Sequence, residues 1–374
     1  MNPYFITCPD YDPARLRAAL LQLLAPLGSM DSFVKPGQKV LLKPNLLSAD
    51  EPGKRITTDP ALVREVGRLA LEAGGQVMIG DSPALDNFNK TATRTGMRTV
   101  ALELGLELVE LNQPVRVETP AGGRYQSLEL SRPALEADVI INLPKLKTHS
   151  QMVLTLGVKN MFGTVVGMRK GEWHHMAGRD LIAFASMLLD VARTVKPALT
   201  IMDGIWGMEG QGPSNGDARH FGLLAAGRQP LTLDLNLAAM LGLDWDMFPL
   251  AQAAAALGQL PDPWPEPVWL DGEALVLKNV KLPVAASIRF LPGFMEGLTR
   301  RYLVSRPAQD LARCILCGKC QDICPEKCIS RKNKTLLFDY GRCIRCYCCQ
   351  EVCPANAVLL KPGWLARALN LLGR

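Results

Sequence analysis

The stretch Cys314-Ile-Leu-Cys-Gly-Lys-Cys-Gln-Asp-Ile-Cys-Pro325 recurs 29 residues later as Cys343-Ile-Arg-Cys-Tyr-Cys-Cys-Gln-Glu-Val-Cys-Pro354. Each run has three cysteines at Cys-x2-Cys-x2-Cys spacing and a fourth directly before a proline. Ten of the 11 cysteines lie between Cys314 and Cys353, which leaves Cys8 alone in the rest of the chain. Such clustering indicates a local metal-binding site rather than disulfides spread along the chain.

This spacing is that of bacterial two-cluster ferredoxins, in which three close thiolates bind one iron–sulfur cube and the fourth binds the other. We therefore predict two [4Fe-4S] clusters with crossed ligation. Zinc is the alternative, but a zinc site closes with four ligands and needs neither the third Cys-x2 step nor the repeat. The first cluster would use Cys314, Cys317, Cys320 and Cys353, and the second would use Cys343, Cys346, Cys349 and Cys324.

Two further cysteines lie in this region. By the 29-residue offset Cys328 takes the place of Ala357, so we expect a small buried residue beside a cube. Cys348 takes the place of Lys319, so we expect it at the surface and open to oxidation. Neither is assigned as a ligand.

Composition sets the class of the whole chain. Its 374 residues are 48% hydrophobic and 21% charged, which is typical of a globular protein and excludes a disordered or coiled-coil chain. The net charge of +6 is too small to indicate nucleic-acid binding. Neither an 18-residue apolar stretch nor an export signal is found, so a cytoplasmic location with reduced thiols is expected.

The cysteine region itself is slightly basic, with eight Lys or Arg against five Asp or Glu in residues 310–360. An acidic electron-donor protein, a ferredoxin or flavodoxin, is therefore the expected partner. An ordinary solvated surface is the alternative.

The first 285 residues alternate between β-rich and helical segments. We expect strands at 39–45, 76–79, 106–110, 137–143 and 198–202, and helices at 60–72, 91–104 and 180–194. This alternation predicts an α/β domain over residues 1–285, with a parallel or mixed sheet flanked by helices. A small α+β two-cluster ferredoxin-like domain follows at 310–360. Residues 286–309 form an amphipathic linker and residues 361–374 an amphipathic tail; both either pack on the body or touch a membrane.

Polar residues follow four of the expected strands, where ligands of α/β proteins bind. If residues 145–149 are extended, their two lysines and one histidine share one side and suit a carboxylate or phosphate. Each motif alone also reads as an ordinary turn or helix cap. The candidate binding residues are Lys43, Asn45, Ser82, Lys145, Lys147, Lys159, Asn160 and Asp203, and the candidate catalytic residues are His149 and Asp81.

Other cofactor signatures are missing from the sequence. It has no Gly-x4-Gly-Lys-Ser/Thr loop, no Gly-x-Gly-x2-Gly fingerprint and no His-Glu-x2-His pair. The glycine-rich segment 207–216 reads equally well as a substrate lid and as an ordinary loop.

Five motifs together resemble one family. They are Lys-Val-Leu-Leu-Lys-Pro-Asn-Leu (39–46), Gly-Asp-Ser-Pro (80–83), Ile-Ile-Asn-Leu-Pro-Lys-Leu-Lys-Thr-His (140–149), Gly-Val-Lys-Asn-Met-Phe-Gly (157–163) and Asp-Gly-Ile-x3-Glu-Gly-x-Gly-Pro (203–213). They resemble domain of unknown function 362, many of whose members carry a C-terminal two-cluster ferredoxin module. The resemblance implies an iron–sulfur protein of prokaryotes, often anaerobes, whose reaction is not established.

The leading hypothesis is a reductase of an organic anion, in which electrons arrive through the clusters and His149 or Asp81 handles protons. The anion pocket would gather Lys43, Lys145 and Lys147 at one sheet edge and open towards the ferredoxin module. The alternative is an electron carrier or scaffold whose large domain docks a partner enzyme. A third reading, iron–sulfur delivery or sensing, would give Cys328 or Cys348 a role.

Overall fold

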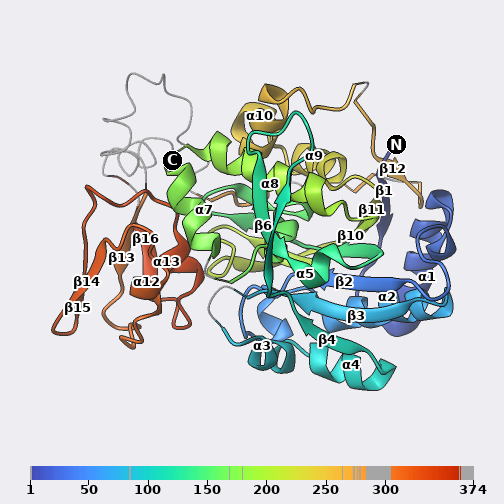
Figure 1. Cartoon of the computed structure of the whole chain (residues 1–374), viewed down its shortest axis with the longest axis horizontal. Helices are drawn as coiled ribbons and strands as arrows, with labels where there is room; N and C mark the ends of the chain where they lie inside the picture. Colours follow the sequence, from blue (N-terminus) through green and yellow to red (C-terminus); the bar gives the residue numbers. More distant parts are fainter. Residues whose placement is uncertain are drawn as a thin grey trace.

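The computed structural model describes residues 2–83, 86–167, 169–178, 180–262, 264–272, 274–275, 277, 279–283, 305–361 and 363. The large domain is a mixed sheet between two layers of helices, and the small cysteine-rich module packs at one side of it (Figure 1). The α/β prediction, with a second small α+β domain, is confirmed.

Within the described residues the large sheet has ten strands, eight of them in the order β12-β1-β11-β10-β7-β2-β3-β4. Strands β10, β7, β2, β3 and β4 run parallel, whereas β11 pairs antiparallel with both β10 and β1. The bounds are β1 Tyr4–Thr7, β2 Lys39–Pro44, β3 Gln76–Asp81, β4 Glu107–Glu110, β7 Val139–Leu143, β10 Leu199–Glu209, β11 Asp217–Gly227 and β12 Val268–Trp269.

The chain leaves β2 for β3 on one side, and β7 leads to β10 on the other side. The carboxyl ends of β2 and β7 therefore lie at the point where the connections diverge, which is where open α/β sheets bind ligands. Beyond Pro144 the chain forms β8 (Lys145–His149), which pairs with β10 and with β9 (Val153–Thr155). Strand β8 thereby extends the sheet past the ends of its neighbours, towards the module.

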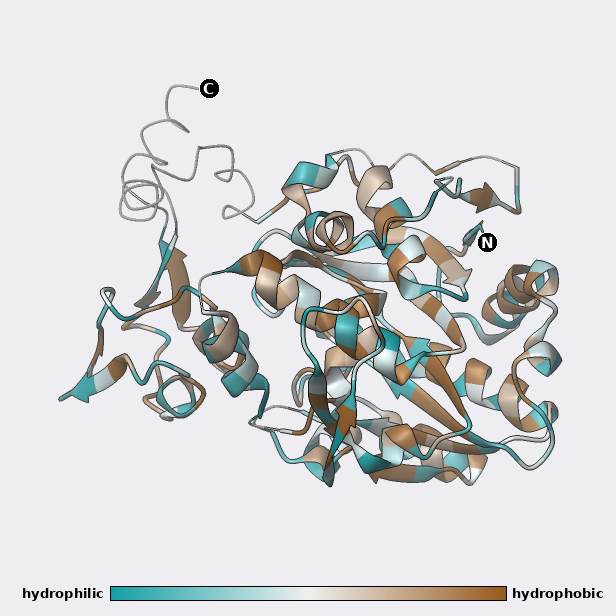
Figure 2. Ribbon diagram, turned by 45° about the horizontal axis from the view of Figure 1, so that its top comes forward, coloured by the Kyte–Doolittle hydropathy of each residue, from teal (hydrophilic) through white to brown (hydrophobic). Residues whose placement is uncertain are grey.

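Helices cover both faces because each buries one apolar side. One core contains Leu16, Leu62 and Val100, and the other contains Phe184 and Leu235. Figure 2 shows hydrophobic residues concentrated along the strands between these layers. On the first face lie α1 Pro13–Leu24, α2 Pro60–Glu72, α3 Phe88–Arg94 and α4 Met97–Leu104; on the second lie α6 Gly157–Asn160, α7 Arg169–Ala177, α8 Leu181–Val195, α9 Pro230–Met240 and α10 Pro249–Ala256.

Local signals explain the ends of α2. The Asp59 side chain accepts a hydrogen bond from the Ala61 amide, and Pro60 occupies the first helical position. The helix ends before Gly74, whose φ of +84° suits glycine. The predicted helix 60–72 is thus observed with the same bounds.

Two expected elements are wrong in detail. The helix expected at 91–104 is divided into α3 and α4 at Gly96, whose φ is +81°. The strand expected at 198–202 continues to Glu209, because β11 pairs with it along this length. Asp203 therefore lies within β10 rather than after it, and only residues 210–216 of the glycine-rich segment form the loop between these strands.

The module has two short antiparallel pairs, β13 (Arg306–Gln309) with β16 (Val358–Lys361) and β14 (Ile329–Lys332) with β15 (Thr335–Phe338). Two short helices, α12 (Lys319–Asp322) and α13 (Cys348–Glu351), contain cysteines of the two runs. Strand β13 falls in the segment expected as linker, so the paired module begins before residue 310. Residues 286–304 of the linker, and all of the tail except 361 and 363, lie outside the described residues.

In the part of the chain that the structure describes, no helix combines the length and the apolar character needed to cross a membrane.

The large domain also carries a hairpin, β5 (Pro114–Glu118) with β6 (Ser127–Ser131), followed by the short helix α5 (Arg132–Leu135).

Candidate functional site

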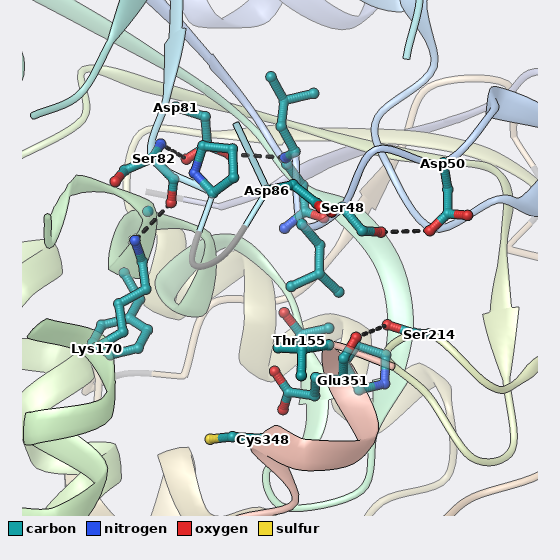
Figure 3. Close-up of a pocket in the computed structure, with 18 of the residues that line it drawn as sticks. Ser48, Asp50, Asp81, Ser82, Asp86, Thr155, Lys170, Ser214, Cys348 and Glu351 are labelled. Carbon is teal, nitrogen blue, oxygen red and sulfur yellow. Dashed lines mark hydrogen bonds between the residues drawn. The ribbon is translucent and has the colours of Figure 1, made fainter. Parts of the chain in front are cut away.

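A pocket with a cavity volume of about 180 Å³ lies at the carboxyl ends of β2 and β3, beside β8. The module forms its opposite wall, so the pocket lies between the two domains. Figure 3 shows Lys170 and Ser82 on the large-domain side and Cys348 and Glu351 on α13. Among the predicted site residues, those that line it are Lys43, Asn45, Asp81, Ser82, Lys147, His149, Lys159 and Asn160.

The eight cysteines of the two runs line two small cavities of the module. One is lined by Cys314, Cys317, Cys320 and Cys353, and the other by Cys324, Cys343, Cys346 and Cys349. Each cavity thus collects three thiols of one run and the last thiol of the other run. The residues present fit two cubes with crossed ligation, although the individual ligands stay a prediction.

Cys353 also lines the large pocket between the domains. The first cysteine cavity and the pocket therefore share a wall. An electron held in that cavity would need to cross little protein to reach a molecule in the pocket.

The expectation that Cys348 lies at the surface is wrong. Its side chain is 5% exposed and lines the interdomain pocket, because α13 packs against the large domain. The matched residue Lys319 lies at the same interface, where its Nζ is 2.6 Å from Asp86 Oδ1. Cys328 is buried, and its Sγ lies 3.5 Å from Cys324 Sγ.

Lys43 and Asp81 form a buried ion pair in the pocket wall. Lys43 Nζ lies 2.8 Å from Asp81 Oδ1, and Asp81 also accepts hydrogen bonds from the amides of Leu46 and Ser82. A Cβ atom on Gly163 would lie 2.2 Å from Asp81 Oδ1, so only glycine fits over the pair. Since its carboxylate is committed to these partners, Asp81 is poorly suited to the proton transfer that the sequence suggested.

Lys147 is held at the pocket by fixed acceptors. Its Nζ donates to Asn45 Oδ1 at 2.9 Å and to the Ile56 carbonyl at 2.7 Å. Asn160 in turn accepts a hydrogen bond from Asn45 and donates to the Lys43 carbonyl. Burial, and after it the nearby charge of Lys159, lower the pKa of Lys147 to about 7.

Lys159 and Lys170 complete the cationic lining. Burial lowers the pKa of Lys170 to about 7, and its Nζ donates to the Ser82 carbonyl at 2.6 Å. Lys159 makes no hydrogen bond or ion pair with any described residue, and its Nζ lies 5.9 Å from the centre of the Phe162 ring. Its ammonium group is thus available to an anion.

The His149 ring is neutral, and both of its nitrogens lie close to polar groups. Its Nδ1 accepts hydrogen bonds from the Gln151 and Met152 amides, and its Nε2 lies 2.9 Å from Glu351 Oε1. Burial lowers the pKa of His149 to about 4. Burial raises the pKa of Glu351, but His149 and Lys159 outweigh this and bring it to about 2. Since Nδ1 accepts, the proton of the neutral ring is on Nε2, where it faces the Glu351 carboxylate of the module.

Sequence reasoning missed the contribution of α7. Lys170 and His174 both line the pocket, yet neither follows a strand. His174 stacks on Phe184 with ring centres 4.1 Å apart, and its Nδ1 has no hydrogen-bond partner among the described residues. Burial lowers the pKa of His174 to about 3, so the ring is neutral. The triplet Trp173-His174-His175 was the available signal, but it lacks ligand spacing.

Lys145 and Asp203 do not line the pocket, which corrects the expectation that they do. They lie opposite each other where β8 pairs with β10, and Lys145 Nζ is 2.8 Å from Asp203 Oδ2. Asp203 also accepts hydrogen bonds from the Tyr11 hydroxyl and the Asp59 amide. We call these four residues the Lys145 cluster.

Polar contacts join the module to the large domain around the pocket. The Ser214 hydroxyl donates to the Glu351 carbonyl at 3.1 Å, and Gln350 Nε2 donates to the Gln211 carbonyl at 3.4 Å. The glycine-rich loop 210–216 thus contacts α13. Gly212 is required there, because a Cβ atom would lie 2.1 Å from the Thr148 carbonyl oxygen on β8.

Comparisons with known proteins agree with this architecture. Residues 40–239 match the family described as domain of unknown function (DUF362), and residues 313–357 match the 4Fe-4S dicluster domain. The second match confirms the prediction of two [4Fe-4S] clusters.

Thylakoid-associated protein sll1697 from Synechocystis sp. is 42% identical over 310 residues, which cover 79% of this chain and 92% of that protein. A structure of the lactate racemase apoprotein from Thermoanaerobacterium thermosaccharolyticum matches with a TM-score of 0.39 and 14% identity, over 62% of this chain and 55% of that one. Since the first family match spans more than half of the 374 residues, the chain belongs to the DUF362 family, with a two-cluster ferredoxin module at its C-terminal end.

Proposed function

We propose that this protein is a reductase of an organic anion that receives electrons through its two [4Fe-4S] clusters. One observation carries the proposal: the same pocket is lined by five lysines of the large domain and by Cys353, a predicted ligand of the first cluster.

The charges of the pocket favour an anion. Of the four acidic residues that line it, Asp81 pairs with Lys43, Asp86 with Lys319 and Asp50 with Lys54, while Glu351 lies against His149. The other lining lysines, Lys90, Lys147, Lys159 and Lys170, form no ion pair with a described residue. Lys159 makes no hydrogen bond or ion pair with a described residue, while Lys147 and Lys170 have lowered pKa values. A bound carboxylate would pair with Lys159 and raise the pKa of both other lysines again.

The apolar part of the wall suggests an organic molecule rather than an inorganic ion. Leu46 and Phe162 of the large domain and Ile323 and Val352 of the module line the same cavity. A cavity of about 180 Å³ has room for a small carboxylate with a carbon skeleton.

One-electron transfer is the chemistry that each cluster supplies when bound, and two transfers with two protons reduce an acceptor A to AH2. The chain supplies the binding and the protons. Lys147 and Lys170 are the best proton donors, since a pKa of about 7 allows exchange near neutral pH. They replace His149 and Asp81 in that role, while His149 orients Glu351 at the domain interface.

The alternative function, a carrier or scaffold, would need no such pocket, and the pocket therefore favours the reductase. Delivery or sensing through Cys328 or Cys348 is less well supported, because both thiols are buried. A cytoplasmic location stays part of the proposal; the name of the Synechocystis relative makes contact with a membrane surface the alternative.

Thermal-shift measurements on anaerobically purified protein test the anion site. We would use fumarate, benzoate and cinnamate as probes, with inorganic phosphate for comparison. At least one carboxylate should raise the melting temperature, and Lys159→Ala should weaken its binding about ten- to 150-fold, the equivalent of 1.5–3 kcal/mol for a charge-assisted contact. Lys39→Ala is the matched control, since Lys39 lies exposed at the amino end of β2.

The reductase proposal fails if no carboxylate stabilises the protein, or if Lys159→Ala and Lys39→Ala bind it equally well. A carboxylate that binds but does not reoxidise the dithionite-reduced clusters would indicate a binding protein instead. Iron and sulfide content of each variant shows whether the clusters are intact.

A further inference from the structure

The two cysteine cavities differ in their access to solvent. The four thiols of the second cavity are buried, whereas around the first Cys317 is exposed and Cys314 is partly exposed. Two large apolar side chains lie beside these cysteines in the sequence. Leu311 and Ile315 are 67% and 66% exposed, which is unusual for residues of this type.

These residues belong to the loop 311–318, which precedes α12, and a basic hairpin lies next to it. Arg331, Lys332 and Lys334 at the turn between β14 and β15 are exposed, and none forms an ion pair with a described residue. Gln309, just before the loop, donates to the Lys334 carbonyl and accepts from the Leu336 amide. Leu336 of β15 lines the first cysteine cavity, so the hairpin and the loop flank the same site.

The first cysteine cavity borders the solvent at one cysteine and the interdomain pocket at another. Cys317 faces solvent, whereas Cys353 lines the pocket. Figure 1 shows the β14–β15 hairpin at the edge of the module farthest from the large domain. We define the donor face as Leu311, Arg313, Ile315, Cys317, Arg331, Lys332 and Lys334.

We propose that the donor face is the docking site of an acidic electron-carrying protein of the ferredoxin or flavodoxin type. The inference deepens the proposed function and rests on its redox role. The cations attract an acidic partner over a distance, which raises the rate of encounter. The exposed leucine and isoleucine give a small dry contact beside Cys317, as suits a weak, transient interface with short electron transfer.

Stopped-flow reduction of the oxidised full chain tests this assignment without any substrate. The probe is a reduced acidic flavodoxin, and dithionite serves as a small reductant that needs no docking. At low ionic strength, Lys332→Glu/Lys334→Glu should slow reduction by flavodoxin about tenfold or more and remove its salt dependence. Leu311→Ser and Ile315→Ser should slow it by a smaller factor, while dithionite reduces all variants at the wild-type rate.

Two controls match these changes. Leu102 is 78% exposed on α4 of the large domain, so Leu102→Ser alters an equivalent apolar side chain elsewhere. Lys39→Glu reverses a charge far along the sequence from the module. Both should be reduced by flavodoxin at the wild-type rate.

Unchanged flavodoxin rates in the hairpin double variant would overturn the proposal, because Lys332 and Lys334 lie outside the cysteine runs and their replacement leaves the predicted ligands in place. A dimer that dissociates in Ile315→Ser would also overturn it, since a second copy would then occupy the face. The readout is cluster reduction, so a missing substrate would refute the reductase proposal without touching this one.

Discussion

Two buried lysines, Lys145 and Lys147, lie two residues apart on β8, and they differ in how completely their charges are paired. In the Lys145 cluster, the Asp203 carboxylate accepts hydrogen bonds from Lys145, from the Tyr11 hydroxyl and from the Asp59 amide. Two residues further along, Lys147 donates only to neutral oxygens, and the partly buried Lys159 on α6 makes no hydrogen bond or ion pair with a described residue.

Under the proposed function, this difference separates a structural charge from charges that bind the anion. A buried cation with its own carboxylate gains nothing from an anion, because its charge is already compensated. Burial lowers the pKa of a cation that lies among neutral groups, and an anion that binds beside it raises the pKa again. The lysines of a single motif, Lys-Leu-Lys at 145–147, thus have different environments, and the proposed function gives them different roles.

The largest effect should come from disrupting the Lys145 cluster. Lys145→Ala leaves Asp203 buried and without its cation, so we expect the free energy of unfolding to fall by about 3–5 kcal/mol. Lys159→Ala should lower it by less than about 1 kcal/mol, since its ammonium group has no partner to lose. Anaerobic urea unfolding of the whole chain gives both values; equal losses would contradict the division into two groups.

The pH dependence of stability should distinguish Lys147. Its pKa is lowered from 10.5 to about 7 in the folded chain, so between these values the unfolded state binds one more proton than the folded state. Stability contributed by this group therefore rises with pH across this window, by up to about 1.4 kcal/mol per pH unit.

The matched variant for this test is Lys147→Met, which removes the titrating group but keeps its length. Urea unfolding at pH 7, 8 and 9 gives the slope of the free energy of unfolding against pH. In Lys147→Met this slope should be lower than in the wild type by the contribution of about one proton, which is about 1.4 kcal/mol per pH unit. The same slope in both proteins would mean that Lys147 titrates normally and is not held among neutral oxygens.

The sequence alone predicted more of the cysteine-rich module than of the interdomain pocket. Cysteine spacing alone predicts the clusters, because the thiolates of each run are only a few residues apart. Lys43, Lys147 and Asn160 could also be found, since they follow or adjoin buried strands that end at one edge of the sheet.

The rest depended on pairing over long sequence distances. Lys145 could not be separated from Lys147 without knowing that β10 continues and places Asp203 opposite it. Lys170 and His174 lie on a helix with no strand-end signal, and Glu351 comes from the other domain. For Cys348 the 29-residue match to Lys319 was misleading, because Lys319 itself lies at the interface, where it binds Asp86 of the large domain.

A smaller loss than that of Lys145→Ala is expected for Tyr11→Phe, which removes one hydroxyl from the Lys145 cluster. This hydroxyl donates to Asp203 Oδ1 at 2.6 Å and accepts from Lys145 Nζ at 3.0 Å. Its loss leaves one oxygen of a buried carboxylate without a partner, so we expect about 1–2 kcal/mol of destabilisation in urea unfolding. Tyr125→Phe is the matched control, with less than about 0.5 kcal/mol expected, because the Tyr125 hydroxyl donates only a long bond of 3.4 Å to the Ala183 carbonyl.

Binding of the carboxylate probes should be unchanged in Tyr11→Phe, since Tyr11 does not line the pocket. If that variant binds them tenfold more weakly, Lys145 and Lys147 belong to a single site, and the division drawn between them is wrong.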